Sequence, residues 1–154
     1  MIYMSENYFD FEQDFVESLR CIPMIVRYKL DTCGVKLKLS HWHQFNHLIR
    51  QELVNKPCSK LEEIQSYRVW LHQLVIDHTD TPAKDLSVEK NPAWMDETKI
   101  PEIVQKKAQE VGIKIKLDQW KNLTPLQRFV LIKLSRSNHE NKNFLPAVQE
   151  FQLI

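Results

Sequence analysis

Two segments of the chain place apolar residues at the three- and four-residue spacing of a helix. The first carries Ile22, Ile25, Val26, Leu30 and Cys33 at these positions, and the second carries Ile100, Ile103, Val104, Ala108 and Val111. The spacing predicts a helix in each segment. Pro23 and Pro101 are expected at the first helical position, which tolerates proline, and Gly34 and Gly112 where each helix should stop.

After each glycine the pattern changes from helical spacing to alternation. Residues 35–39 read Val-Lys-Leu-Lys-Leu, and residues 113–117 read Ile-Lys-Ile-Lys-Leu. Alternation of apolar and polar residues is typical of a short, half-buried strand. These two segments are expected either to pair with each other or to serve as extended connectors.

Each segment then carries a tryptophan, Trp42 or Trp120, on a predicted short turn. Ser40 and Asp118 are expected to cap these turns at their N-termini. Because the two tryptophans occupy equivalent positions, packing in the core is the expected role of both.

Further helices are predicted from capping residues and apolar spacing. Asn46 and Thr124-Pro125 are expected to begin helices over about 47–55 and 125–135. Between the two segments, Ser59-Lys-Leu-Glu62 reads as a capping box for a helix that reaches about His78. The N-terminal segment is expected to enter a helix by about residue 12, and residues 144–151 are expected to form a short last helix.

The two segments are similar at a constant offset of 78 residues. Residues 22–53 and 100–131 share 13 identities in 32 ungapped positions: Ile22, Pro23, Ile25, Val26, Lys29, Gly34, Lys36, Lys38, Leu39, Trp42, Leu48, Arg50 and Leu53 return 78 positions later. We therefore predict a mostly α-helical, internally duplicated, pseudo-symmetric single domain over 1–154. Residues 79–98 are its linker, and it has at most two short extended segments.

Composition excludes several classes of protein. The net charge is +1, so no global field favours nucleic acid, and no run reaches the roughly 18 apolar residues of a membrane span. The start of the chain lacks the features of a signal peptide. Three cysteines without close pair spacing indicate a reducing compartment, and a cytoplasmic location is expected.

The best metal candidate is a histidine cluster, His41, His43 and His47. The four-residue spacing of the last two suits zinc on a helical face, but Asn46 interrupts the helix and no nearby carboxylate or cysteine completes a site. The second segment has Gln119, Lys121 and Pro125 instead, so the shared architecture needs no metal. We therefore expect neither metal nor cofactor; a small metal- or thiol-dependent redox protein using this cluster or Cys21 is the alternative.

The cysteines are interpreted one by one. Cys33 aligns with Val111 and is expected to be a small core hydrophobe. Cys58 lies in a loop and is interpreted as incidental. Cys21 is expected to be more exposed, and an inert thiol is favoured over a reactive one.

No nucleophilic triad, phosphate-binding glycine loop or dinucleotide fingerprint occurs in the sequence, so no catalytic residue is expected. Arg50 and Arg128 are expected to form salt bridges to the other copy. The least explained segment is the polar stretch 135–143, which has no counterpart in the first copy. It is expected to be a solvated loop or, as loops between rigid helices often are, a recognition site. Its candidate partner-binding residues are Arg136, His139, Glu140 and Asn143, together with Cys21.

Several long strings resemble the nitrate reductase-associated protein family. They are Phe11-Glu12-x-Asp14-Phe15-Val16-Glu17-Ser18-Leu19-Arg20-Cys21-Ile22-Pro23-Met24, Val26-Arg27-x-Lys29-Leu30-Asp31, Gly34-x-Lys36-Leu37-x-Leu39, Trp42, Thr124-Pro125-Leu126-Gln127-Arg128-Phe129, Leu131-Ile132-Lys133-Leu134-Ser135-Arg136, His139-Glu140-Asn141 and Asn143-Phe144-Leu145-Pro146. The resemblance covers roughly residues 9–151. It implies a small cytosolic, non-enzymatic protein that associates with assimilatory nitrate reductase, a molybdenum and iron–sulfur enzyme, and supports its activity, maturation or stability.

Overall fold

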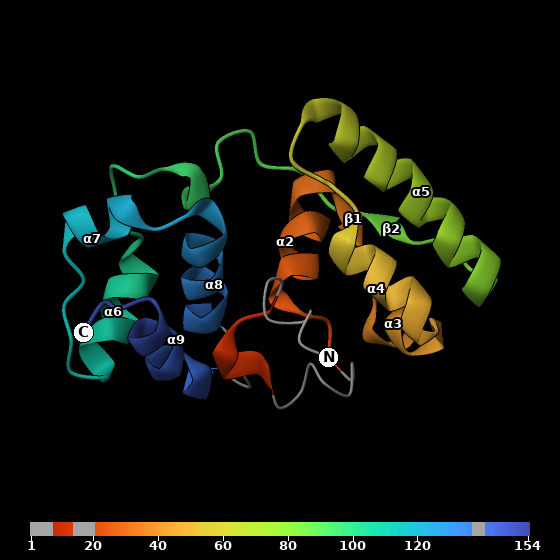
Figure 1. The fold of residues 1–154 in the computed structure, drawn as a ribbon. Coiled ribbons are helices and arrows are strands. Elements are labelled where there is room, and N and C mark those ends of the chain that lie inside the picture. The colour runs from red at the N-terminus through yellow and green to blue at the C-terminus, as the bar shows by residue number, and fades with distance from the viewer. Residues whose placement is uncertain (1–7, 14–20, 137–140) are drawn as a thin grey trace. The chain divides into compact units, whose positions relative to one another are not determined.

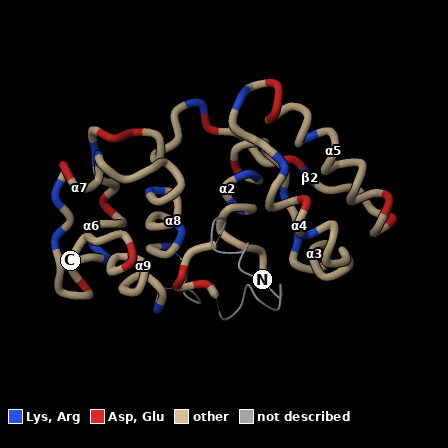
Figure 2. The backbone as a smooth tube through the Cα atoms, in the orientation of Figure 1, with Lys and Arg blue, Asp and Glu red and all other residues tan. Residues whose placement is uncertain are grey.

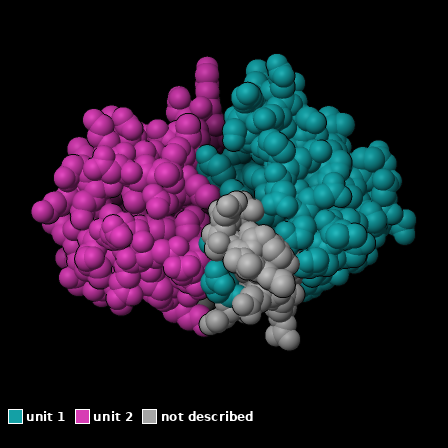
Figure 3. All heavy atoms as spheres, viewed as in Figure 1, with its two compact units in different colours: residues 1–8, 12–88 teal, residues 9–11, 89–154 magenta. Residues whose placement is uncertain are grey.

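The computed structural model describes residues 8–13, 21–136 and 141–154. These residues form mainly α-helices with one two-stranded sheet, which confirms the mostly α-helical class. The chain divides into two compact units, residues 1–8 with 12–88 and residues 9–11 with 89–154 (Figure 3). The single pseudo-symmetric domain stays a prediction, and the boundary at Val88 falls within the predicted linker.

The first unit is built around α5, its longest helix (Figure 1). Its elements in chain order are α2 (Met24–Cys33), β1 (Val35–Lys36), α3 (Leu39–Gln44), α4 (His47–Asn55), α5 (Leu61–Thr79) and β2 (Lys84–Asp85). Helix α5 packs against α2 and α3, and α2 packs against α4. The buried face of α5, with Tyr67, Leu71 and Val75, closes the core of this unit.

The two strands are antiparallel, with Val35 opposite Asp85 and Lys36 opposite Lys84. Pairing between residues 35–39 and 113–117, one of the two alternatives, is therefore wrong. The true partner of β1 lies in the predicted linker and is held by α5: Asp85 forms ion pairs with Arg68 at 2.7 Å and with His72 at 2.9 Å. Residues 113–116 are extended without strand pairing, as the connector alternative expects.

The second unit is built around α8, which packs against η3, α6 and α9. Its elements are the 3-10 helix η3 (Ala93–Met95), α6 (Glu102–Glu110), α7 (Leu117–Asn122), α8 (Pro125–Arg136), the 3-10 helix η4 (Asn141–Asn143) and α9 (Phe144–Glu150). Helix α9 matches the predicted last helix. Near the N-terminus, η2 (Asp10–Glu12) is a 3-10 helix, and the helix expected beyond residue 12 falls largely outside the described residues.

Several helix ends lie where the sequence predicts them. Asn46 begins α4, and its side-chain oxygen accepts a hydrogen bond from the Ile49 amide at 2.9 Å. The Thr124 hydroxyl does the same for the Gln127 amide at 3.1 Å, at the start of α8. At the other end of α2 and α6, Gly34 and Gly112 adopt left-handed φ angles of 78° and 81°.

Other predicted helix starts are wrong by one or two residues. Helices α3 and α7 begin before Ser40 and Asp118, so these residues are not the caps. The amides of the N-cap residues Lys38 and Lys116 donate instead to the side chains of His41 and Gln119. At α5, the predicted Ser59 box is likewise wrong: Lys60 is the N-cap, and Glu63 accepts from its amide. Pro23 and Pro101 are N-caps rather than first helical residues.

The prediction that both tryptophans belong to the core is confirmed, because Trp42 and Trp120 are 0% exposed. The expected salt bridges from Arg50 and Arg128 to the other copy stay a prediction. Arg50 Nε donates to the carbonyl oxygen of Trp42, and Arg128 Nε donates to that of Trp120, each at 3.1 Å. The carboxylate near Arg128, that of Glu97 at 3.8 Å, belongs to the same unit.

Equivalent elements of the two units begin at the offset that relates the two sequence segments. Helices α2 and α6 begin at Met24 and Glu102, and α3 and α7 span 39–44 and 117–122. A common origin of the two segments remains a prediction. No described helix combines the length and the apolar character needed to cross a membrane.

The two left-handed glycines make a matched pair for mutation. A Cβ at Gly34 would lie 2.6 Å from Val88 Cγ2 and 2.9 Å from the Leu86 carbonyl oxygen, whereas a Cβ at Gly112 has nothing within 4 Å. At both positions an alanine would have to adopt a left-handed φ angle, which costs free energy. We expect Gly112→Ala to lower the free energy of unfolding by about 1 kcal/mol and Gly34→Ala by about 3 kcal/mol. Urea denaturation measures both, and equal losses would contradict the close packing around Gly34.

Candidate functional site

The described surface of the first unit is hollowed along α4 and between the end of α4 and the start of α5, and we call these hollows together the α4–α5 groove. It consists of two adjoining parts that share Lys56. One part, of about 450 Å³, is lined by Leu48, Gln51, Glu52, Asn55 and Lys56. The other, of about 280 Å³, is lined by Lys56, Pro57, Glu62, Glu63 and Ser66. Concave surfaces are where ligands and partner side chains find the most contact.

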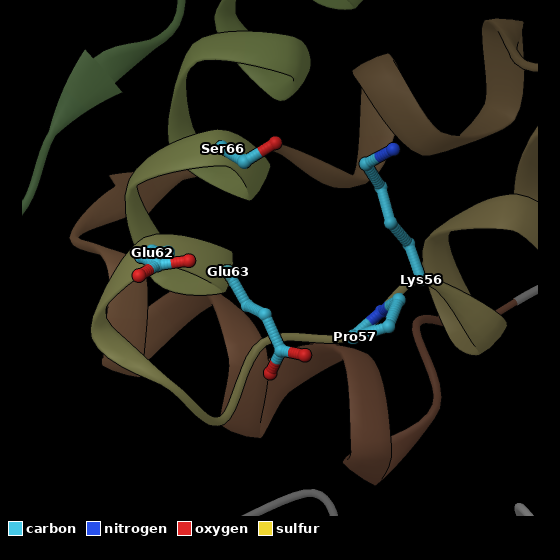
Figure 4. Close-up of a pocket in the computed structure, with 5 residues that line it drawn as sticks. All are labelled: Lys56, Pro57, Glu62, Glu63 and Ser66. Carbon is cyan, nitrogen blue, oxygen red and sulfur yellow. The ribbon is translucent and has the colours of Figure 1, made fainter.

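The two walls of the groove come from different elements (Figure 4). Lys56 and Pro57 belong to the loop after α4, and Glu62, Glu63 and Ser66 lie on the first turns of α5. The Lys56 amine lies 4.9 Å from the centre of the Trp70 ring, a cation–π contact that holds its long side chain against α5. The groove is therefore bordered by a loop on one side and by the first turns of α5 on the other.

Lys29 supports the loop that forms one wall of the groove. Its buried amine donates to the carbonyl oxygens of Val54 and of Lys56, the second at 2.7 Å. These carbonyls lie at the end of α4, where the helix itself supplies no donors. Burial lowers the pKa of Lys29, because its charged form loses water there. The lysine thus links α2 to the groove wall.

The acidic groups of the groove have different roles. The Glu63 carboxylate accepts from the amides of Lys60 and Ser59 at 2.9 Å and 3.1 Å. These bonds lower the pKa of Glu63, so it remains ionised as the cap of α5. Glu52 and Glu62 are exposed and free to meet a partner. Figure 2 shows that acidic residues also occur at the other end of α5.

The side chains that line the groove are suited to contact with another protein. Among the described residues that line it, Ser66 carries the only hydroxyl group, and none is a histidine or a cysteine that would activate it. The groove offers carboxylates, side-chain amides and one lysine, beside Leu48, which is 74% exposed. Exposed apolar and charged groups on a rigid frame are typical of a protein-binding surface.

The predicted partner-binding residues are only partly described. Arg136 is exposed at the end of α8, and Asn143 is half-buried before α9. His139 and Glu140 lie outside the described residues. Cys21 is half-buried just before α2, in the other unit. The proposal that these residues bind a partner therefore remains a prediction.

The histidine cluster does not converge. His41 is buried, and its Nδ1 accepts from the Lys38 amide at 3.2 Å, whereas His43 and His47 are exposed. Burial, with a smaller effect from the charge of Lys38, lowers the pKa of His41. Across the described part of the chain, no three or more His, Cys, Asp or Glu side chains are grouped to hold a metal ion.

The α4–α5 groove and its support were missed by sequence reasoning. Cys33 is a buried core residue, as predicted, but Cys58, interpreted as incidental, is only 4% exposed. Its thiol donates to the carbonyl oxygen of Lys29 at 3.9 Å. The recurrence of Lys29 as Lys107 indicated that this lysine has a structural role. The sequence around it did not indicate which groups it would bond.

The buried position of His41 predicts a pH effect on stability. In the unfolded chain a histidine titrates near pH 6.5, and the lower pKa in the folded state means that acid favours unfolding. The stability of the wild-type protein should therefore be complete above about pH 6.5 and fall as the pH drops below that value. Gln119 caps α7 in the equivalent way, so His41→Gln should keep the cap without titrating.

Thermal melting at about pH 7.5 and about pH 5.5 checks this expectation, because these conditions lie above and below the ordinary pKa of histidine. The melting temperature of His41→Gln should change less between these conditions than that of the wild type. His43→Gln, on the exposed neighbour, is the control and should behave as the wild type. If the melting temperature of His41→Gln changes with pH as much as that of the wild type, His41 is not protected from protonation.

Comparison with known proteins identifies the family. No curated protein and no solved structure matches the chain. A family model described as conserved nitrate reductase-associated protein matches residues 8–151. This match spans both compact units and nearly the whole sequence of 154 residues. The chain therefore belongs to the nitrate reductase-associated protein family.

Proposed function

We propose that this chain is a non-enzymatic accessory protein that binds assimilatory nitrate reductase and supports its activity, maturation or stability through direct contact. The observation that carries the proposal is the family match over residues 8–151. The partner would be the molybdenum and iron–sulfur enzyme, and the contact would occur in the cytoplasm. The chain itself would need neither metal nor cofactor.

The α4–α5 groove supports contact as the mechanism. Glu52 and Glu62 are exposed on its two walls, and Leu48 adds an apolar surface beside them. Charged groups at the rim steer a partner and set its orientation, while apolar groups supply buried area. We propose that a segment of the reductase carrying basic side chains occupies this groove.

A second contact would lie in the polar segment near the end of α8. Arg136, His139, Glu140 and Asn143 are its proposed residues, and Cys21 is the proposed contact in the other unit. Arg136 is exposed, which agrees with such a role. These residues give a second surface to test beside the groove.

The test is a tagged capture of the chain from its own host grown on nitrate, with quantitative mass spectrometry. We expect the nitrate reductase large subunit to be recovered with the wild type. Reversing both groove charges, Glu52→Lys with Glu62→Lys, should reduce recovery by about tenfold, because a basic partner would meet like charge. Glu110→Lys, a charge reversal at another exposed glutamate, on α6, is the control and should not reduce it.

Two further outcomes decide between the surfaces. Arg136→Glu with His139→Ala reduces recovery if the polar segment contacts the reductase, and leaves it unchanged if it is only solvated. Failure of the wild type to capture the reductase, with nitrate reduction intact in a strain lacking the chain, would contradict the proposed function itself.

A further inference from the structure

Two of the three cysteines meet in the core of the first unit. Cys33 is the last residue of α2, and Cys58 lies in the loop between α4 and α5. They are 25 positions apart in sequence, 58 − 33, and belong to the same buried cluster, with 2% and 4% of their surfaces exposed. Neither takes part in the α4–α5 groove directly.

The two thiols are hydrogen-bonded to neighbouring points of one helix. Cys33 Sγ donates to the carbonyl oxygen of Leu30 at 3.8 Å, and Cys58 Sγ to that of Lys29 at 3.9 Å. These carbonyls are consecutive in α2. The interaction of the two thiols with each other lowers the pKa of Cys33 and raises that of Cys58, so the two side chains are near neighbours.

Basic side chains surround the pair. The Lys29 amine bonds to two carbonyl oxygens at the end of α4, just before the loop that carries Cys58, and Arg68 Nη1 donates to the carbonyl oxygen of Cys33 at 2.9 Å. Positive groups near a thiol favour its thiolate, which is the reactive form in disulfide exchange. Structural cysteines in an apolar core ordinarily lack such neighbours.

We propose that Cys33 and Cys58 form a redox-active dithiol, which a low-molecular-weight disulfide converts reversibly into an intramolecular disulfide bond. One thiolate attacks the oxidant, forms a mixed disulfide and releases the first small thiol. The second thiolate then displaces the remaining small thiol and closes the bond between the two cysteines. Two electrons pass from the protein to the oxidant disulfide, and the two cysteine protons end on the two small thiols that leave.

The oxidant reaches the pair by local opening of the loop that carries Cys58. Pro57 and Ser59, on either side of this cysteine, are exposed, so the segment that carries Cys58 lies at the surface of the unit. Loops open at a smaller free-energy cost than the helices that flank them. Attack therefore does not require unfolding of α2.

Oxidation would act on the α4–α5 groove because Cys58 follows Lys56 and Pro57 directly. Both of these residues line the groove. A disulfide bond would remove the thiol hydrogen bond to Lys29 and tie the loop covalently to the end of α2. The reduced and oxidised proteins would then present different groove walls. The proposed dithiol does not depend on the proposed contact with nitrate reductase.

The test oxidises the full-length reduced protein with glutathione disulfide under native conditions. Intact mass spectrometry should show a loss of about 2 Da, two hydrogens, and thiol titration should fall from three groups to one. Peptide mapping should place the bond between Cys33 and Cys58, and dithiothreitol should restore both thiols. Stable glutathione adducts without this bond, or a bond that includes Cys21, would overturn the proposal.

Variants separate the pair from the third cysteine. Cys21→Ser should still lose two hydrogens, whereas Cys33→Val and Cys58→Ala should not. Valine is the residue at the position equivalent to Cys33 in the second segment, so this replacement is expected to fold, and circular dichroism verifies that it does. Loss of two hydrogens in a folded Cys33→Val protein would contradict the assignment.

Discussion

An arginine that donates to the carbonyl oxygen of a buried tryptophan eight residues earlier organises both units of this protein. Trp42 and Trp120 lie on helices of only six residues, which are too short to be stable alone. The last carbonyls of such a helix have no donors within it. Arg50 and Arg128 add a side-chain donor from the next helix to the carbonyl oxygens of Trp42 and Trp120, which also accept from the backbone amides of Phe45 and Leu123. This second bond ties each short helix to the helix that follows it.

The second unit uses this contact most completely. Arg128 is almost fully buried and also donates to the carbonyl oxygens of Trp94, Lys121 and Leu123. Its side chain therefore joins η3, the end of α7 and the start of α8. Arg50 is less buried and donates to Trp42 and His43, while stacking over the Trp42 ring at 5.4 Å. The same arginine–tryptophan pair is thus buried at the centre of the second unit and lies nearer the surface in the first.

The sequence predicted those features of the fold that depend on local chemistry. Gly34, Gly112 and Asn46 fix helix ends through their own backbone or side chain, and all three were predicted correctly. The starts of α3, α5 and α7 were misplaced because the capping side chain belongs to the third helical residue, which sequence patterns identify less clearly. The partner of β1 depends on Asp85 contacts across the unit, which no local pattern encodes.

The candidate site was harder to predict for the same reason. The α4–α5 groove is lined by residues of α4, of the loop after it and of α5, and its support by Lys29 joins residues more than twenty positions apart. The closeness of Cys33 and Cys58 is likewise a product of packing. The long family strings, in contrast, identified the family from sequence, and the family model agrees.

The central claim of this account is direct association with nitrate reductase. The most direct measurement is a binding isotherm by calorimetry, with the purified full-length chain titrated into purified nitrate reductase from the same host. The account predicts saturable binding that weakens with salt, because charged groups at the rim of the groove would contribute. Absence of heat and of co-elution at the highest reachable concentrations, with an active reductase, would contradict it.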